Sequence, residues 1–445
     1  MRRIIILLLF VVAYGAVAQS FDTAKLDSYL SSLEANDKAM LSLAIVENGE
    51  PVYQRAIGFA DKGSATKANQ NTQYRIGSIT KVFTAVMIFQ LIEEGKLSLT
   101  TPLSQFYPNV AKADDITISM LLSHRSGIHN FTNMADYPRY MTQPKSKAEM
   151  VSIIERMESD FTPGSQAQYS NSGYVLLGFI LEDITESDYA SQLKLRITSK
   201  LGLSRTEYGG PIAVSENQAM SYQFKDNAWT PATQTDMSIP HGAGAIISTP
   251  TDVAVFLSGL FNGKLVSADS LAKMQEINQG YGRGLFQIPF YNRFAYGHTG
   301  GIDGFSSQGA YFENDNAAIV VTANGMNYPL NDVSIGVLSI YFDVGFELPD
   351  FSQQPVTLPT EVLSSYEGVF ASKDIPLKIT LKVRDGQLTA QATGQGAFDL
   401  TAYSATEFRF APAGITLLFE QNKKGIDYAA FVLRQGGQSP KFTRE

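Results

Sequence analysis

One stretch of this 445-residue chain, Tyr74-Arg-Ile-Gly-Ser-Ile-Thr-Lys81, and the apolar run behind it decide the fold and the chemistry. The run from Ile79 to about Glu94 is apolar on nearly every side and stops at Gly95, which predicts a buried central helix. Ser78 lies where this helix begins, so its amide is among the N–H groups that have no acceptor within the helix. The positive end of the helix dipole would face an oxyanion formed there. The stretch therefore predicts a nucleophilic serine at the tip of a core helix.

Lys81 follows Ser78 by three residues, which places both side chains on one face of the helix. Burial disfavours the ammonium form, so we expect the pKa of Lys81 to fall from its usual value of about 10.4 and the amine to accept protons. Ser-x-x-Lys also occurs at 64–67, 191–194 and 270–273, but no turn presents those serines at a helix start. The alternative interpretation is a capped helix with a surface lysine.

Two later segments carry compatible groups. Tyr169-Ser-Asn171 lies between a loop and a predicted helix. A tyrosine beside a cationic lysine is expected to have a stabilised phenolate and to relay protons, and Asn171 can donate to a substrate carbonyl. The glycines of His298-Thr-Gly-Gly301 allow close approach, and the Gly301 amide can complete an oxyanion hole with that of Ser78. Each segment also has an ordinary structural interpretation, but their order along the chain indicates an acyl-transfer site.

This set of motifs resembles the serine β-lactamase and penicillin-binding superfamily. It is most similar to class C β-lactamases and the related DD-carboxypeptidases, D-aminopeptidases and esterases. The resemblance covers residues 25–345 and also includes Ile116-Thr-Ile-Ser-Met-Leu-Leu-Ser-His-Arg-Ser-Gly127 and Phe161-Thr-Pro-Gly164. It implies an α+β fold, with an antiparallel sheet flanked by helices plus a helical subdomain, and a site in the cleft between them.

The resemblance also implies roles for the residues of the site. Ser78 would be the nucleophile and Lys81 with Tyr169 the acid/base pair, of which either could be the acylation base. Asn171 would bind substrate, and His298, Thr299, Gly300 and Gly301 would form a strand-edge wall. Many members have lysine where this chain has His298, and a neutral histidine offers no permanent cation to a substrate carboxylate. This favours the carboxypeptidase, aminopeptidase and esterase branches over an efficient β-lactamase. We interpret His124 and His129 as helix-end structure.

The chain divides into four predicted segments. Residues 1–18 have the basic, apolar and small-residue layout of a signal peptide, with an uncleaved anchor as the alternative. The apolar run is shorter than the ~20 residues of a spanning helix, so we expect a periplasmic or secreted protein without a stable membrane anchor. Residues 19–347 would be the hydrolase domain and 348–361 a proline-containing linker. Residues 362–445 are predicted to form a small all-β barrel that resembles a lipocalin-like domain. We expect this barrel to have a role in packing, dimerisation or access to the cleft.

Composition excludes several other classes. The chain has no cysteine, and its net charge of −8 includes no basic block, so neither thiolate chemistry nor nucleic-acid binding is expected. No Gly-x-Ser-x-Gly or His-Glu-x-x-His is present, and we expect no metal and no cofactor. The expected partner is a small-molecule or peptide substrate, and the oligomeric state is left open.

Together these observations predict an exported serine hydrolase that forms an acyl-enzyme on Ser78. The expected activity is that of a D-Ala-D-Ala carboxypeptidase, D-amino-acid peptidase or esterase. The alternatives are a non-catalytic penicillin-binding receptor for cell-wall peptides and a weak class C-like β-lactamase.

Overall fold

The computed structural model describes residues 21–445 except 395, 411–414, 424 and 436–438. The predicted signal peptide, residues 1–18, lies outside the described residues. Across the described part of the chain, no helix combines the length and the apolar character needed to span a bilayer.

The larger part of the molecule is built on an antiparallel sheet. Within the described residues it has six strands in the order β10-β11-β12-β13-β1-β2. These strands are β1 (Ala39–Glu47), β2 (Glu50–Ile57), β10 (Phe286–Phe290), β11 (Arg293–Ile302), β12 (Phe305–Phe312) and β13 (Ala317–Met326). Turn residues between apolar runs predict hairpins over 41–60 and 305–324, and both are confirmed, as β1–β2 and β12–β13. Asn48 and Gly49 both have positive φ, as an Asn-Gly hairpin turn requires.

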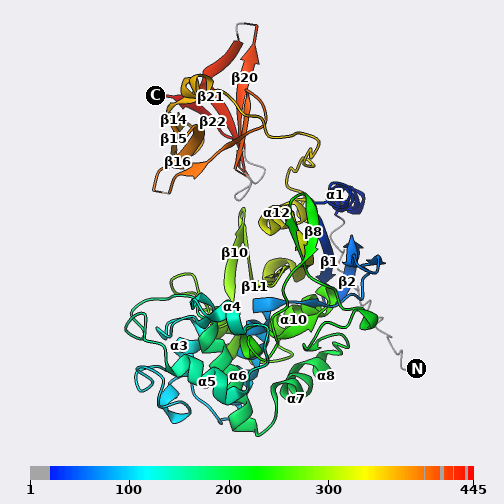
Figure 1. Cartoon of the computed structure of the whole chain (residues 1–445), viewed down its shortest axis with the longest axis vertical. Helices are drawn as coiled ribbons and strands as arrows, with labels where there is room; N and C mark the ends of the chain where they lie inside the picture. The colour runs from blue at the N-terminus through cyan, green and yellow to red at the C-terminus, as the bar shows by residue number, and fades with distance from the viewer. Residues whose placement is uncertain (1–20, 395, 411–414, 424, 436–438) are drawn as a thin grey trace, which may run out of the picture.

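Successive side chains of a strand point to opposite sides of a sheet. The side chains of the central strands β1 and β13 are buried on both sides. On β13, Ile319 and Val321 join a core with α1 and α12, whereas Ala318 and Val320 join a core with α2 and α10. Helices therefore cover both faces, as Figure 1 shows. The expected α+β fold, an antiparallel sheet flanked by helices, is confirmed.

The helices of this part are α1 (Thr23–Ala35), α2 (Thr80–Glu93), α3 (Ile118–Leu122), α4 (Tyr137–Tyr140), α5 (Lys147–Glu155), α6 (Asn171–Thr185), α7 (Tyr189–Leu193), α8 (Ser199–Leu201), α9 (His241–Gly244), α10 (Pro250–Phe261), α11 (Ala268–Gln275) and α12 (Leu330–Tyr341). Helices α3 to α8 form the predicted helical region, seen in cyan and green at the bottom of Figure 1. The sequence of 188–200 predicts one helix, but a π-helical turn at Lys194–Thr198 separates α7 from α8.

Short strands form the small antiparallel sheets β3-β4, β5-β9-β6 and β7-β8. They are β3 (Phe59–Asp61), β4 (Thr66–Lys67), β5 (Tyr74–Arg75), β6 (Glu207–Tyr208), β7 (Tyr222–Lys225), β8 (Ala228–Pro231) and β9 (Ile246–Ser248). Strand β5 pairs with β9 immediately before the predicted serine. The helix itself begins slightly later than expected, because Gly77–Ile79 form the 3-10 turn η1 ahead of α2.

The C-terminal part is an antiparallel sheet of nine strands among the described residues. They are β14 (Gly368–Ser372), β15 (Lys378–Arg384), β16 (Gln387–Ala392), β17 (Phe398–Asp399), β18 (Thr401–Ala402), β19 (Glu407–Phe410), β20 (Ile415–Asn422), β21 (Gly425–Arg434) and β22 (Lys441–Arg444), preceded by α13 (Thr360–Leu363). The two edge strands, β17 and β18, are separated only by Leu400, so the sheet nearly closes on itself. An apolar core that includes Tyr366, Phe408 and Phe431 fills it.

The start of α2 is fixed against β11 by close backbone contacts. A Cβ at Gly77 would lie 2.8 Å from the Gly301 nitrogen, and one at Gly300 would lie 2.1 Å from the Ile76 carbonyl oxygen. The Ser307 hydroxyl on β12 donates to the same Ile76 carbonyl at 2.8 Å. Glycine is required at both positions because any side chain would force the turn and the strand apart.

A buried ion pair supports this junction. The Arg75 guanidinium lies 2.8 Å from the Asp303 carboxylate, and both side chains are almost fully buried. Asp303 in the β11–β12 turn also accepts from the Thr235 amide and hydroxyl. The pair thus connects β5, the turn after β11 and the loop before α9.

Replacing Asp303 with Asn should lower the free energy of unfolding by about 3–5 kcal/mol, because it leaves the Arg75 charge buried and unpaired. Urea denaturation followed through Trp229, the single tryptophan, reports on this part of the chain. The exposed Asp27–Arg55 pair is the matched control, and Asp27→Asn should cost less than about 1 kcal/mol. Equal costs for the two variants would contradict the supporting role of the buried pair.

Candidate active site

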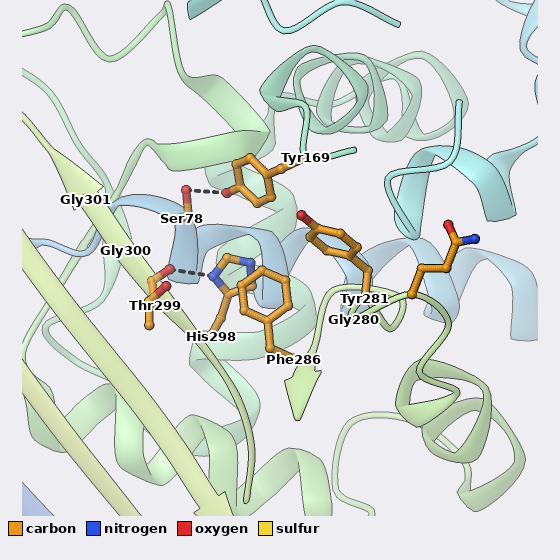
Figure 2. Close-up of a pocket in the computed structure, with 10 residues that line it drawn as sticks. Ser78, Tyr169, Gly280, Tyr281, Phe286, His298, Thr299, Gly300 and Gly301 are labelled. Atoms are coloured by element: carbon orange, nitrogen blue, oxygen red, sulfur yellow. Dashed lines mark hydrogen bonds between the residues drawn. The ribbon is translucent and has the colours of Figure 1, made fainter. Parts of the chain in front are cut away.

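The structure brings the three predicted catalytic side chains together. The Ser78 hydroxyl oxygen lies 2.8 Å from the Lys81 amine and 2.8 Å from the Tyr169 hydroxyl. Figure 2 shows the serine and the phenol pointing toward each other at the start of α2. Ser78 comes from η1, Lys81 from the first turn of α2 and Tyr169 from the loop before α6, as the spacing of the motifs predicted.

Lys81 is completely buried and has two further partners. Its amine donates to the Asn171 side-chain oxygen at 2.7 Å and to the Ala243 carbonyl of α9 at 2.8 Å. Burial holds the pKa of Lys81 well below its ordinary value, as expected from the sequence. A neutral amine has two N–H bonds, and these two acceptors use both of them. In that state the lone pair is left to accept the Ser78 hydroxyl proton over the 2.8 Å contact.

Tyr169 differs from its expected state. Burial raises the pKa of Tyr169 above its ordinary value, and its hydrogen bond with Ser78 offsets this only in part. The expected stabilised phenolate is therefore wrong, because the low-dielectric site favours the uncharged phenol over the phenolate. The arrangement can remove a proton from Ser78 through Lys81 and supply one through Tyr169.

His298 on β11 is buried below the cleft surface. Its ring stacks on Phe286 with centroids 4.1 Å apart, and its Nδ1 contacts the Thr299 carbonyl. That contact places the proton on Nδ1 and leaves Nε2 as an acceptor, which has no hydrogen-bond partner among the described residues. Burial lowers the pKa of His298 to about 3. The histidine is thus neutral, so this position offers no permanent cation to a substrate carboxylate.

Thr299, Gly300 and Gly301 line a cleft of about 550 Å³ together with Ser78, Tyr169, His298, Gln279, Gly280, Tyr281 and Phe286. The wall over 279–286 was not predicted, because its loop carries no motif and its aromatic residues have no periodic spacing. None of these ten residues is a lysine, arginine, aspartate or glutamate. The cleft is therefore lined by neutral groups.

Asn171 lies beside the catalytic groups, with its side chain already engaged. Its oxygen accepts from Lys81, and its Nδ2 donates to the Thr132 hydroxyl at 3.3 Å. Its role toward substrate stays a prediction.

The contact of Lys81 with the Ala243 carbonyl was not predicted, because a backbone acceptor leaves no signal in a sequence. Over the described ranges, no three His, Asp or Glu side chains lie close enough together to hold a metal ion.

The family model described as Beta-lactamase matches residues 30–335, more than half of the chain. The chain belongs to the Beta-lactamase family. This confirms the resemblance drawn from the motifs, and the protein is a hydrolase of the β-lactamase and penicillin-binding superfamily.

Curated relatives of this β-lactamase-family hydrolase match its larger part. A putative penicillin-binding protein, PbpX of Bacillus subtilis, is 27% identical over 307 residues, 68% of this chain and 74% of that protein. A teichoic acid D-alanine hydrolase of Staphylococcus aureus is 24% identical over 306 residues, 67% of this chain and 73% of that protein.

Solved structures extend the comparison. D-amino acid amidase from Ochrobactrum anthropi, complexed with D-phenylalanine, is 27% identical with a TM-score of 0.61, covering 68% of this chain and 91% of that one. An octameric penicillin-binding protein homologue from Pyrococcus abyssi has a TM-score of 0.67 at 23% identity and covers 95% of this chain and 100% of that one. The second likeness extends the shared fold to the C-terminal strands.

The neutral, buried state of His298 predicts a pH-dependent stability. The unfolded chain protonates this histidine below about pH 6.5, whereas the folded protein keeps it neutral to about pH 3. The free energy of unfolding should therefore fall as the pH drops through this window.

His298→Gln should remove about 1.4 kcal/mol per pH unit of that slope, as measured by urea denaturation between pH 6 and 4. Above pH 7 both states are neutral, so parent and variant should show the same slope, which is an internal control. Unchanged slopes between pH 6 and 4 would show that His298 takes up a proton in the folded protein.

Proposed function

We propose that this protein is an exported hydrolase that cleaves amide or ester bonds of D-amino acid derivatives through an acyl-enzyme on Ser78. The main observation behind this proposal is that the Ser78 oxygen lies 2.8 Å from both a buried amine of lowered pKa and a phenol. Nucleophile, base and acid are thus in contact before any substrate arrives.

In the proposed reaction, Ser78 attacks the substrate carbonyl carbon while its proton passes to Lys81. The resulting oxyanion is stabilised by the amides of Ser78 and Gly301, which lie at the η1–β11 junction. Tyr169 donates its phenolic proton to the leaving nitrogen or oxygen as the bond to the carbonyl carbon breaks, and regains a proton from Lys81. Water then hydrolyses the ester on Ser78 by the reverse transfers, which restores the free serine.

The neutral cleft supports this substrate class. A C-terminal peptide carboxylate or a β-lactam carboxylate lacks a cationic partner among the ten lining residues. Simple amides and esters do not need that partner. The D-amino acid amidase and the teichoic acid D-alanine hydrolase are named for substrates of this kind. This favours D-amino acid amides and esters over D-Ala-D-Ala peptides and cephalosporins.

The other candidate class is a non-catalytic receptor for cell-wall peptides. A receptor does not require an amine and a phenol in contact with the same serine hydroxyl, so this arrangement favours the enzyme.

Export is supported by the three-part composition of residues 1–18.

A fluorophosphonate should form a covalent adduct with the parent protein and none with Ser78→Ala. Intact-mass analysis of labelled protein from the periplasmic fraction tests the chemistry and the export together. The expected species lacks residues 1–18 and carries one probe. A parent protein without an adduct would favour the receptor, and an adduct only on full-length cytoplasmic protein would overturn export alone. In a substrate panel, the parent protein should hydrolyse D-phenylalanine amide faster than a D-Ala-D-Ala peptide or a chromogenic cephalosporin.

Tyr169→Phe should separate substrates by leaving group. An amide needs a proton on its leaving nitrogen, so kcat/KM should fall about 10²-fold or more. A p-nitrophenyl ester of the same D-amino acid releases a stable phenolate, and its loss should stay under about tenfold. Equal losses for the two substrates would contradict the role of Tyr169 as the acid.

A further inference from the structure

His124 has an unusual place beside the catalytic groups. It directly follows the residue that caps α3, has a left-handed backbone with φ of 56°, and is 97% buried, with a relative exposure of 3%. Helix ends with this conformation are usually occupied by glycine or asparagine, because a larger side chain is strained there. A histidine at this position needs a reason beyond ending a helix.

The contacts of His124 supply that reason. Its backbone carbonyl accepts from the Gln168 amide at 2.8 Å, and its ring Nδ1 accepts from the Ser170 amide at 3.2 Å. These two amides belong to the residues on either side of Tyr169. The His124 ring also packs on the Tyr169 ring, with centroids 4.4 Å apart. One residue therefore holds the backbone before the tyrosine, the backbone after it and the face of its phenol.

We infer that His124 is a positioning residue for Tyr169, holding the phenol at hydrogen-bond distance from Ser78. The inference rests on the proposed function, because it assigns His124 a role through the proposed acid. The left-handed backbone contributes to this role, because it lets the carbonyl and the ring of His124 reach the amides on both sides of Tyr169.

The contact also sets the protonation state. Because Nδ1 accepts an N–H, the ring must be neutral, with its proton on Nε2. The titratable groups packed around it are Tyr169, Tyr174 of α6 and Tyr281, with Lys81 and His298 nearby. Burial lowers the pKa of His124 well below its ordinary value. The hydrogen bond from the Ser170 amide to Nδ1, which with the carbonyl contact forms a clamp on Tyr169, therefore persists around neutral pH.

Two variants separate the parts of this device. His124→Asn tolerates the left-handed backbone and keeps an acceptor bonded to Cγ, but loses the ring. His124→Phe keeps the ring and loses the acceptor. We expect the Phe variant to lower kcat/KM for the D-amino acid amide about 10–10²-fold and that for the p-nitrophenyl ester less than threefold. The Asn variant should recover most of the amide activity, and the fall should lie in kcat rather than KM.

Controls distinguish this role from a general loss of structure. His129→Asn changes a partly exposed histidine in the same motif, and both activities should stay within about twofold of the parent. Fluorophosphonate titration counts the competent sites in each preparation. Losses of amide and ester activity in equal proportion, or a Phe variant as active as the parent, would overturn the inference.

If Tyr169→Phe shows amide-selective loss and His124→Phe does not, only the positioning role fails. If neither variant shows it, the proposed role of Tyr169 fails first and the inference falls with it. A crystal structure of a folded His124→Phe protein gives an independent reading. The distance between the phenol and the Ser78 oxygen should exceed the 2.8 Å of the parent, and an unchanged distance would overturn the inference.

Discussion

The site depends on burying a lysine amine in the core of the protein. Lys81 sits on a helix whose first twelve residues are buried, and it can be accommodated there only as a neutral amine with its hydrogen bonds satisfied. Asn171 and the Ala243 carbonyl meet that need and at the same time direct the remaining lone pair at Ser78. The condition that makes the lysine tolerable in the core is also the one that makes it a base.

The surrounding fold keeps three separate pieces of chain in register around that amine. Backbone contact at Gly77 and Gly300 holds the serine turn against β11, the buried Arg75–Asp303 pair holds the end of that strand, and His124 packs against the tyrosine loop. Each of these contacts is short and buried, so the hydroxyl, the amine and the phenol are held by stiff elements. Such pre-organisation lowers the cost of reaching a reactive geometry.

Features that arise from local chemistry were predictable from the sequence. The buried helix α2, the Asn-Gly hairpin and the strand-rich C-terminal part follow from periodicity and turn residues, and the order of the motifs identified Ser78, Lys81 and Tyr169. Features that arise from tertiary contact were not predictable. The Ala243 carbonyl, the clamp at His124 and the 279–286 wall exist only once distant segments meet. The phenolate expectation failed for the same reason, because the burial that raises the pKa of Tyr169 is a property of the folded protein.

The pairing of β1 with both β13 and β2 has a consequence for how the molecule assembles. Residues 39–47 lie in the middle of the finished sheet, yet one of their partners, residues 317–326, is synthesised much later. The same holds in the C-terminal part, where β22, residues 441–444, inserts between β14 and β21. Neither sheet can be completed while the ribosome is still midway along the chain. Folding therefore requires the closure of very long loops. Such topologies fold slowly and leave aggregation-prone strand edges unpaired until the partner strands are made.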